Sequence, residues 1–363
     1  MEGSLKILMT ADSIGGVWTY CIDLCRALLP YDVEVHLAVM GKYPDSHQRK
    51  QAEQLPNVTL HQSTFKLEWM HEPWEDVDLA QDWLVSIYED IKPDMMHFNN
   101  YGQVNYDWDC PVITVFHSCV LTWWQAVKNE NAPAAWERYG ALVASALANS
   151  DAVVFPTEAI KLQAECFYGK IENTSIINNA RNINIPSGIP KEPFIFCAGR
   201  IWDEAKNIHM LSRIAGRLPW PLFIAGDNGD ATETYQNIVL LGTLNPDEIR
   251  QWMAKASIYI NPAKYEPFGL SVLEAAKAGC ALALSGIDTL LEIWNDSAVY
   301  FDPHKEDEAL QALSRLVSDK NLRQRLSLKA KERAVRYDTK LMANQYMSLY
   351  KKAAKYKAIS QTL

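Results

Sequence analysis

The sequence predicts an α/β protein with two domains, each built on a parallel sheet that is covered by helices. The length of 363 residues suggests two domains of ordinary size. Short apolar runs that favour strands alternate with longer helical stretches, which is typical of parallel sheets. The alternation starts afresh after residues 183–193, which contain three prolines and a glycine and have the composition of a linker. We therefore expect a first domain over residues 1–183 and a second over residues 190–340.

The composition is that of a water-soluble enzyme or binding protein. Apolar residues make up 48% and charged residues 22% of the chain, and no apolar run approaches the roughly 20 residues that span a bilayer. The net charge is −9, and residues 1–150 carry 9 Lys and Arg against 20 Asp and Glu. An acidic first half argues against nucleic acid as a partner. The seven cysteines lack zinc-ligand spacing and the first residues lack a signal-peptide pattern, so we expect reduced thiols and a cytoplasmic location.

The first domain is predicted to begin with a strand, a glycine turn and a helix. Residues 5–10 are mostly apolar, Gly15 and Gly16 form the turn, and residues 17–29 form a helical stretch. The GxGxxG spacing is absent, so a nicotinamide or flavin cofactor is not expected. Further strands are predicted at residues 33–39, 58–61, 95–98, 111–116 and 152–155, and helices at residues 77–90 and 134–148.

The second domain repeats this pattern. Strands are predicted at residues 194–198, 221–225, 238–241, 257–260 and 281–284. Helices are predicted at residues 270–277, 305–318, 322–337 and 339–357. In sheets of this kind ligands bind beyond the carboxyl ends of the strands. Functional residues are therefore expected in the loops that follow the strands.

Residues 261–280 carry the strongest functional signal. Their sequence, NPAKYEPFGLSVLEAAKAGC, predicts a tight loop at Pro267 and Gly269 and then a helix. The free amides at the start of such a helix bind anions, phosphate above all. Glu266 and Glu274 lie near these amides and would repel a phosphate unless each held a neutral group such as a hydroxyl. A nucleotide-sugar, with a diphosphate between two polyols, meets both demands.

The run E-P-F-G-L-S-x-L-E-A, with its two acids eight positions apart, resembles the E-x7-E signature of retaining glycosyltransferases of family four. For Glu274 alone, an exposed helical acid is an equally simple interpretation. The resemblance covers nearly the whole chain and implies the GT-B fold, in which two Rossmann-like domains face each other across a cleft. It also implies that the last helix, at about residues 341–363, packs back on the first domain.

The resemblance also identifies candidates for binding the diphosphate. The G-R-x5-K-N run at residues 199–207 is similar to the family's diphosphate clamp, in which Arg200 and Lys206 would stabilise the leaving nucleoside diphosphate. Gly16 matches the glycine whose amide approaches the donor phosphate. The amides expected to complete the phosphate site belong to Phe268, Gly269, Leu270 and Ser271.

Three side chains receive roles at the sugar and the ribose. Glu266 is expected to bind the donor sugar and Glu274 the ribose hydroxyls. His117, directly after a predicted strand, matches a frequent family histidine and would contact the sugar from the first domain. A structural role for this histidine is the alternative.

Weaker assignments concern the base and the acceptor. Residues 226–229 and 242–244 lie where relatives hold the base, with Leu244 as the candidate contact. Aromatic residues near the first-domain rim suit a sugar acceptor, although core or lid positions explain them equally well. These aromatic residues are Tyr101, Trp123 and Trp124.

One segment departs from the family pattern. Residues 176–182 resemble the family's I-P-N-G-V-D run, but Ala180 and Arg181 replace the expected glycine and apolar residue. Contacts made by that turn in relatives are therefore not carried over.

The resemblance implies a hexosyltransferase that moves a hexose, with UDP-glucose as a fitting donor, to a carbohydrate or glycan-precursor acceptor with retention, as in polysaccharide biosynthesis. A front-face mechanism is implied because no residue stands out as a covalent nucleophile.

Two D-x-D runs, at residues 76–78 and 107–109, resemble metal-binding pairs of other transferases. No metal or cofactor is expected, because the cations of the clamp supply the positive charge that a metal would provide. Two other classes fit the same residues, a nucleotide-sugar epimerase and a non-catalytic nucleotide-sugar sensor. The sequence leaves open the acceptor, the oligomeric state and peripheral membrane contact.

Overall fold

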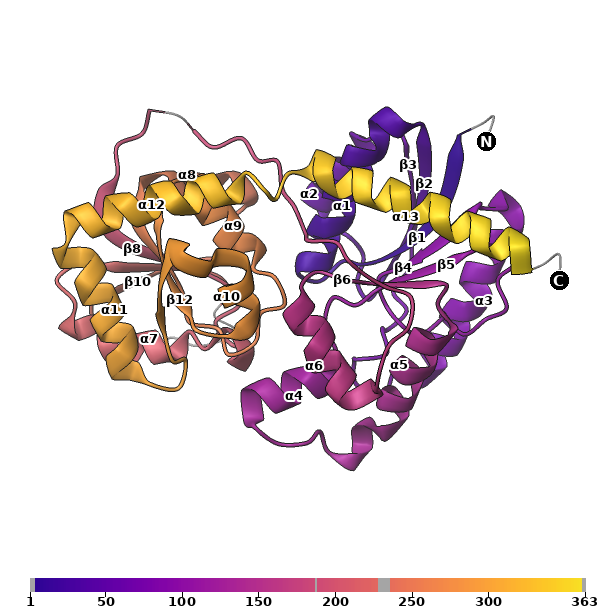
Figure 1. The fold of residues 1–363 in the computed structure, drawn as a ribbon, viewed down its shortest axis with the longest axis horizontal. Helices are drawn as coiled ribbons and strands as arrows, with labels where there is room; N and C mark the ends of the chain where they lie inside the picture. The colour runs from indigo at the N-terminus through magenta and orange to yellow at the C-terminus, as the bar shows by residue number, and fades with distance from the viewer. Residues whose placement is uncertain (1–3, 187, 228–235, 361–363) are drawn as a thin grey trace. The chain divides into compact units, whose positions relative to one another are not determined.

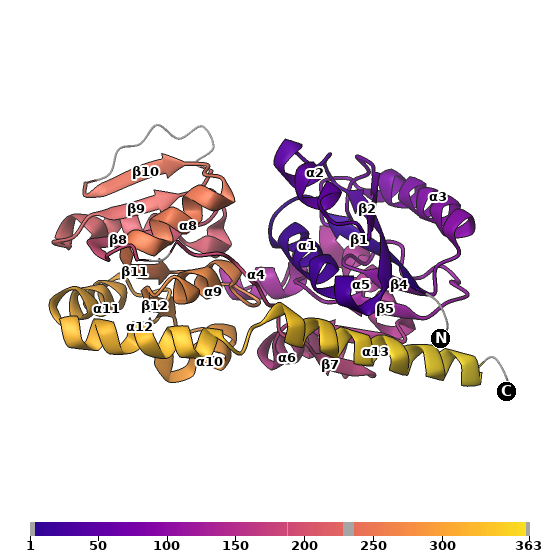
Figure 2. The same cartoon turned by 90° about the horizontal axis from the view of Figure 1, so that it is seen from above.

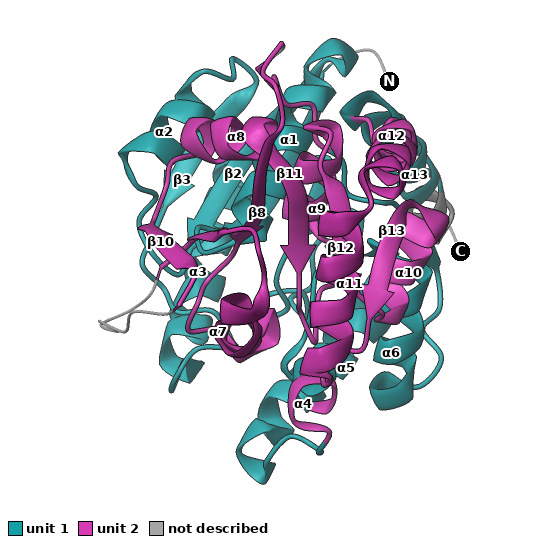
Figure 3. Cartoon of the chain, turned by 90° about the vertical axis from the view of Figure 1, so that its left-hand side faces the viewer, with its two compact units in different colours: residues 1–124, 130–180, 339–363 teal, residues 125–129, 181–338 magenta. Residues whose placement is uncertain are grey.

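The computed structural model of the chain describes residues 4–186, 188–227 and 236–360, with side chains described up to residue 355. It divides into two compact units (Figure 3). The first unit comprises residues 1–124, 130–180 and 339–363, and the second comprises residues 125–129 and 181–338. In the described part of the chain, no helix is both long enough and apolar enough to cross a bilayer.

The first unit contains a seven-stranded sheet in the order β3-β2-β1-β4-β5-β6-β7, and every neighbouring pair is parallel. Its strands are β1 (Leu5–Asp12), β2 (Val33–Met40), β3 (Val58–Gln62), β4 (Met95–Phe98), β5 (Val112–Val115), β6 (Ala152–Phe155) and β7 (Thr174–Ile176). The helices that begin in this unit are α1 (Gly16–Leu28), α2 (Ser46–Glu53), α3 (Trp74–Ile91), α4 (Val120–Lys128), α5 (Glu137–Asn149), α6 (Glu158–Tyr168) and α13 (Thr339–Ser360).

The second unit contains a six-stranded parallel sheet in the order β10-β9-β8-β11-β12-β13, and Figure 2 shows β10 to β12 following one another in this order. Its strands are β8 (Glu192–Ala198), β9 (Leu222–Ala225), β10 (Ile238–Gly242), β11 (Ala256–Asn261), β12 (Ala281–Ser285) and β13 (Ala298–Phe301). Its helices are α7 (His209–Ile214), α8 (Pro246–Lys255), α9 (Leu270–Lys277), α10 (Asp288–Trp294), α11 (Glu306–Ser318) and α12 (Lys320–Ala334).

Both faces of the second sheet are buried, which explains its nearly continuous apolar strands. Successive side chains of a strand point to opposite faces. Accordingly, Ile195 and Cys197 of β8 belong to one buried cluster, which includes residues of α7 and α11. Phe194 and Phe196 belong to another, which includes residues of α8 and α9. The sheet is therefore the middle layer of three.

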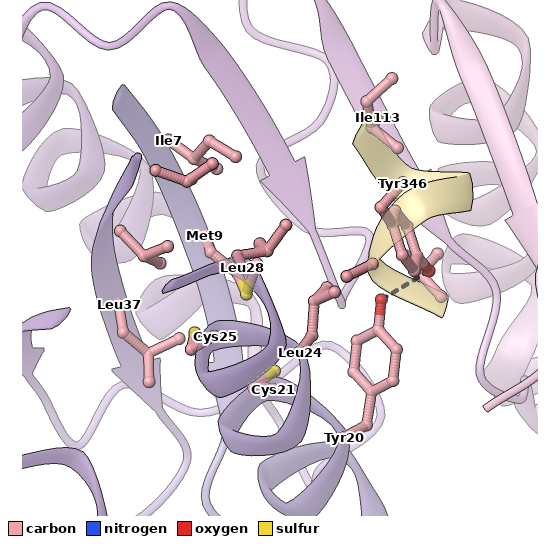
Figure 4. Packing of buried hydrophobic residues seen from close by; sticks show 14 of the residues in the cluster. Ile7, Met9, Tyr20, Cys21, Leu24, Cys25, Leu28, Leu37, Ile113 and Tyr346 are labelled. Carbon is pink, nitrogen blue, oxygen red and sulfur yellow. Dashed lines mark hydrogen bonds between the residues drawn. The ribbon is translucent and has the colours of Figure 1, made fainter. Parts of the chain in front are cut away.

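Helix α13 completes the core of the first unit. It packs alongside α1 (Figure 1). The Tyr20 hydroxyl of α1 donates a hydrogen bond to the Tyr346 hydroxyl of α13 at 2.5 Å, and both residues belong to the buried cluster around Ile7 and Met9 of β1 (Figure 4). The predicted end of this helix at residue 363 lies outside the described residues.

The predicted α/β class is confirmed, and several strand bounds agree with the structure. β4 and β6 have the predicted bounds, and β1 extends two residues beyond its predicted end at residue 10. β7 and β13 were not predicted. Both are edge strands of only 3 and 4 residues, and none of their residues except Phe301 is buried. The Thr-Ser-Ile sequence of β7 lacks the apolar run that identifies a strand, whereas the Ala-Val-Tyr-Phe run of β13 was a signal that the prediction missed.

Gly226, which directly follows β9, has no room for a side chain. A Cβ atom at this position would lie 1.8 Å from the Gly199 carbonyl oxygen, which is backbone and cannot turn away. We expect Gly226→Ala to lower the free energy of unfolding by roughly 3 kcal/mol or more. Gly286→Ala is the matched control, because its Cβ would have its nearest neighbour at 3.5 Å, and a change within about 0.5 kcal/mol is expected. Urea unfolding of both variants tests this, and equal midpoints would contradict the close approach.

Candidate functional site

The second sheet brings two of the predicted site segments to one edge. β8 and β11 are parallel neighbours, so residues 199–207 and 262–269 leave the sheet at the same carboxyl edge. The Lys264 amide donates a hydrogen bond to the Ala205 carbonyl at 2.8 Å. The Asn207 side chain donates to the Pro262 carbonyl at 3.0 Å. The G-R-x5-K-N run therefore lies against the loop that precedes α9.

Arg200 combines an ion pair with an unsatisfied donor. Its Nη2 atom lies 2.6 Å from Asp203 Oδ2, and its guanidinium lies 5.3 Å from the centre of the Trp202 ring. Its Nε atom is buried and has no hydrogen-bond partner among the described residues. A buried donor without an acceptor costs about 1–3 kcal/mol. Arg200 is thus oriented by Asp203 and retains a donor that suits an added anion.

Lys206 and Glu266, which are 60 positions apart in the sequence, form an ion pair. Lys206 Nζ donates to Glu266 Oε2 at 2.7 Å, and the two side chains are 26% and 12% exposed. The Thr289 hydroxyl donates to the Glu266 carbonyl at 2.6 Å, which holds the loop at this point. The structure therefore brings the clamp lysine into direct contact with the candidate sugar-binding acid.

Helix α9 begins at Leu270, with Gly269 in the capping position. Gly269 has a φ of +89°, a conformation that residues with a Cβ rarely adopt, and a Cβ there would lie 3.2 Å from Val272 Cγ2. No side chain caps this helix start. The Phe268 side chain is buried and packs edge to face on Tyr337, with ring centres 5.5 Å apart. Because the first amides of a helix have no acceptor within it, the backbone from Phe268 to Ser271 has the form of an anion site.

Glu274 is buried in the second turn of α9, so the interpretation as a solvent-exposed acid is wrong. Its carboxylate forms an ion pair with Arg181, and the two side chains are only 11% and 15% exposed. The sequence interpretation missed this partner. The sequence did contain a signal for it, because Arg181 is a charged residue at a position where the family pattern has an apolar one.

The first unit places Gly16 and His117 at the carboxyl edge of its own sheet. Gly16 is the first residue of α1, and Gly15 before it has a φ of +87°, which a glycine allows at little cost. His117 follows β5 and lies beside Asn99, which follows the neighbouring strand β4. Its Nε2 atom is 2.8 Å from Asn99 Oδ1, and its ring meets the Tyr20 ring edge at a centre-to-centre distance of 4.7 Å.

Asn99 determines which nitrogen of His117 carries the proton. Its Nδ2 atom donates to the Thr10 carbonyl at 2.7 Å, so its Oδ1 atom is the acceptor that faces His117. His117 therefore donates from Nε2, and Nδ1 of the neutral imidazole is the acceptor nitrogen. Burial lowers the pKa of His117 to about 3. A neutral imidazole with an acceptor nitrogen can bind a sugar hydroxyl but supplies no positive charge near neutral pH.

The two low histidine pKa values predict a loss of stability in acid. Burial is the main cause that lowers the pKa of His97 and of His117 from 6.5 to about 3. Between these values the unfolded chain binds more protons than the folded protein, so the free energy of unfolding falls as the pH is lowered through this window. Each histidine should remove about 2 kcal/mol between pH 7 and pH 5. Urea unfolding at both pH values should show a smaller loss for His117→Asn than for the wild type, and equal losses would contradict the low pKa of this residue.

The remaining candidates are placed as follows. Tyr101 is buried and donates its hydroxyl hydrogen to the Ser118 carbonyl at 2.9 Å, so it supports the backbone next to His117. Trp123 and Trp124 are partly buried on α4, with ring centres 5.6 Å apart. Leu244 is partly buried just before α8. Of the other suggested base-binding residues, Asn228 and Gly229 lie outside the described residues. The roles of these residues stay predictions.

The D-x-D runs occupy exposed or partly exposed positions. Asp107 and Asp109 are exposed in the loop that leads into β5, while Asp76 and Asp78 lie near the start of α3. Among the described residues, no group of three or more His, Cys, Asp or Glu side chains is arranged to hold a metal ion.

Two family models match the chain in succession. The model described as "Glycosyltransferase Family 4" matches residues 14–184, and the model described as "Glycosyl transferases group 1" matches residues 179–333. Together they span residues 14–333, which leaves α13 outside both models. The chain is also 27% identical over 180 residues to the sulfoquinovosyl transferase SQD2 of Arabidopsis thaliana. That match covers 45% of this chain and 35% of the plant protein. The matched segments span about a third to a half of the first curated relatives.

Solved structures share the fold over nearly the whole chain. Sucrose-phosphate synthase from Thermosynechococcus elongatus has a TM-score of 0.77 at 17% identity, covering 96% of this chain and 98% of that one. Anabaena HepE, solved in complex with UDP and glucose, has a TM-score of 0.74 at 16% identity, covering 96% of this chain and 100% of that one. The two parallel sheets are thus those of the GT-B fold.

Proposed function

Because the chain belongs to glycosyltransferase family four, we propose that it transfers a hexose from a nucleoside-diphosphate sugar to a carbohydrate or glycan-precursor acceptor. UDP-glucose is the donor we favour, since the structurally similar HepE was solved with UDP and glucose bound. Polysaccharide biosynthesis is a fitting role. We also propose a cytoplasmic location, because six of the seven cysteines are buried and all are free thiols.

The observation that carries this proposal is the meeting of two cationic side chains and an uncapped helix start at one edge of the second sheet. These elements are Arg200, Lys206 and the start of α9. Breaking the bond between the sugar and the phosphate leaves a nucleoside diphosphate of growing negative charge, and fixed cations and amides stabilise that charge. In this proposal Arg200 and Lys206 hold the diphosphate, together with the amides from Phe268 to Ser271 and the amide of Gly16.

The two acids of the E-x7-E run are proposed to bind different neutral parts of the donor. Glu266 would bind the hexose and Glu274 the ribose, with Leu244 near the base. Neutral His117 would accept a hydrogen bond from the sugar through Nδ1. The leaving phosphate would help to remove the acceptor proton, so the acceptor attacks the face that the phosphate leaves and the configuration is retained. Tyr101, Trp123 and Trp124 are proposed on the acceptor side.

Transfer is expected to proceed without a divalent metal. The reason is that Arg200, Lys206 and the α9 amides supply the positive field that a cation would otherwise provide. Turnover should stay within about twofold in excess EDTA. Loss of activity in EDTA that manganese restores would contradict this expectation.

A thermal-shift screen of nucleotide-sugars tests the donor class. A ligand at 100 times its dissociation constant adds about 2.7 kcal/mol to stability, so the true donor should raise Tm clearly above the shift given by glucose or phosphate alone. Release of UDP during incubation with an acceptor mixture would then show transfer. Formation of an epimer of the donor sugar, or binding without any turnover, would overturn the proposed transfer reaction.

A further inference from the structure

Arg181 is attached to α9 at two points. Its guanidinium forms an ion pair with Glu274, and its backbone carbonyl accepts a hydrogen bond from Lys277 Nζ. Glu274 and Lys277 are three residues apart and therefore lie on the same face of the helix. Lys277 Nζ also donates to the Tyr337 carbonyl at 3.2 Å, which holds its ammonium group in place. Both the side chain and the main chain of residue 181 are thus held by the helix that begins the phosphate site.

The Arg181–Glu274 pair is the most buried of the three ion pairs at the site. Its side chains are 15% and 11% exposed, against 40% and 9% for Arg200 and Asp203 and 26% and 12% for Lys206 and Glu266. An isolated carboxylate at such a position would be strongly disfavoured unless it were paired. The planar guanidinium also restricts the orientation of the carboxylate more tightly than an ammonium would. The apolar residue that the family pattern has at this position could neither pair with the carboxylate nor fix its orientation.

The ion pair leaves Glu274 able to accept further hydrogen bonds. It engages Oε1, and an ionised carboxylate offers about four lone-pair positions. A carboxylate that stays ionised and fixed is a strong acceptor for two adjacent hydroxyls, because hydrogen bonds to charged groups are the stronger ones. The ribose of a nucleotide presents such a pair of hydroxyls.

We propose that Arg181 is the positioning residue of ribose recognition, holding Glu274 ionised and oriented so that the site selects nucleotides with both ribose hydroxyls. This inference rests on the proposed nucleotide-sugar function and deepens it. Arg181 acts through Glu274 and need not touch the sugar or the phosphates. Its removal should therefore affect binding of the ribose while leaving the diphosphate clamp unchanged.

The test compares the affinities of UDP and 2′,3′-dideoxy-UDP by calorimetry. The wild type should prefer UDP by about tenfold or more, the effect of one charged hydrogen bond. Arg181→Met keeps much of the apolar stem and should reduce this preference to within about twofold, mainly by weakening UDP. Arg181→Lys restores a cation and should recover part of the preference. A purely structural role would weaken both nucleotides equally.

A second variant guards against misfolding of the first. Arg181→Met leaves Glu274 buried without its cation, whereas Arg181→Met/Glu274→Gln removes both charges and should recover Tm. The double variant should still lack the preference for UDP.

A normal preference for UDP in Arg181→Met, or an equal loss of affinity for both nucleotides in a folded variant, would overturn the role of Arg181. Wild-type protein that binds UDP and its dideoxy analogue equally would also overturn it but would leave the transfer function standing. Wild-type protein that binds none of UDP, GDP and ADP would overturn the proposed function itself.

Discussion

Replacing Arg200 and Lys206 together by alanine is expected to lower donor turnover by at least about a hundredfold. Each side chain is proposed to make a charged hydrogen bond to the diphosphate, worth roughly 1.5–3 kcal/mol, and 1.4 kcal/mol corresponds to a factor of ten. Each single variant should therefore lose at least about tenfold. The measurement is the initial rate of UDP release from UDP-glucose in the presence of acceptor.

The control removes two other arginines from the same unit. Arg213 and Arg217 form surface ion pairs with Glu306 and Asp307, and exposed pairs of this kind contribute little to stability. Arg213→Ala/Arg217→Ala should therefore keep turnover within about twofold. Equal losses in both double variants would show a general effect of charge, and wild-type turnover in Arg200→Ala/Lys206→Ala would remove the clamp from the mechanism.

Glu266→Gln is expected to lower sugar transfer by about a hundredfold while UDP affinity stays within about twofold. The amide keeps the shape of the side chain but loses the charge that would strengthen a hydrogen bond to the hexose in the transition state, and the loss of one such interaction costs about 10²–10³ in rate. UDP carries no hexose, and Lys206, which pairs with Glu266, keeps its charge in this variant, so UDP binding should be spared. Calorimetry with UDP and a transfer assay with UDP-glucose measure the two effects separately.

Glu274→Gln is the matched comparison, because it makes the same chemical change eight positions along the chain. Here UDP affinity itself should fall by about tenfold, since the proposed partner is the ribose. If both variants bind UDP as tightly as the wild type, the assignment of Glu274 to the ribose is wrong. If both weaken UDP equally, the two acids do not divide the donor as proposed.

The fold was predictable because its buried strands carry their pattern locally. β4 and β6 are buried at every residue, so their apolar runs identify them without knowledge of their neighbours. The start of α9 was predictable for a different reason, because Gly269 marks the turn in the sequence. β7 could not be found in this way, since none of its three residues is buried.

The partners of the site residues could not be read from the sequence. Glu274 and Arg181 are 93 positions apart, and only the folded second unit shows that one neutralises the other. The tautomer of His117 depends on Asn99, whose orientation is set in turn by the Thr10 carbonyl. Spacing along the chain identified residue types with suitable chemistry, but it did not show which charges were already paired.

The anomeric configuration of the product tests the central claim most directly. Purified protein would be incubated with UDP-glucose, an α-linked donor, and an acceptor identified by UDP release, and the anomeric coupling constant of the product would be measured by NMR. A retaining glycosyltransferase should give an α-linked product together with one UDP for each sugar transferred. A β-linked product would contradict the account. Release of UDP without any new glycosidic bond to the acceptor would contradict it as well.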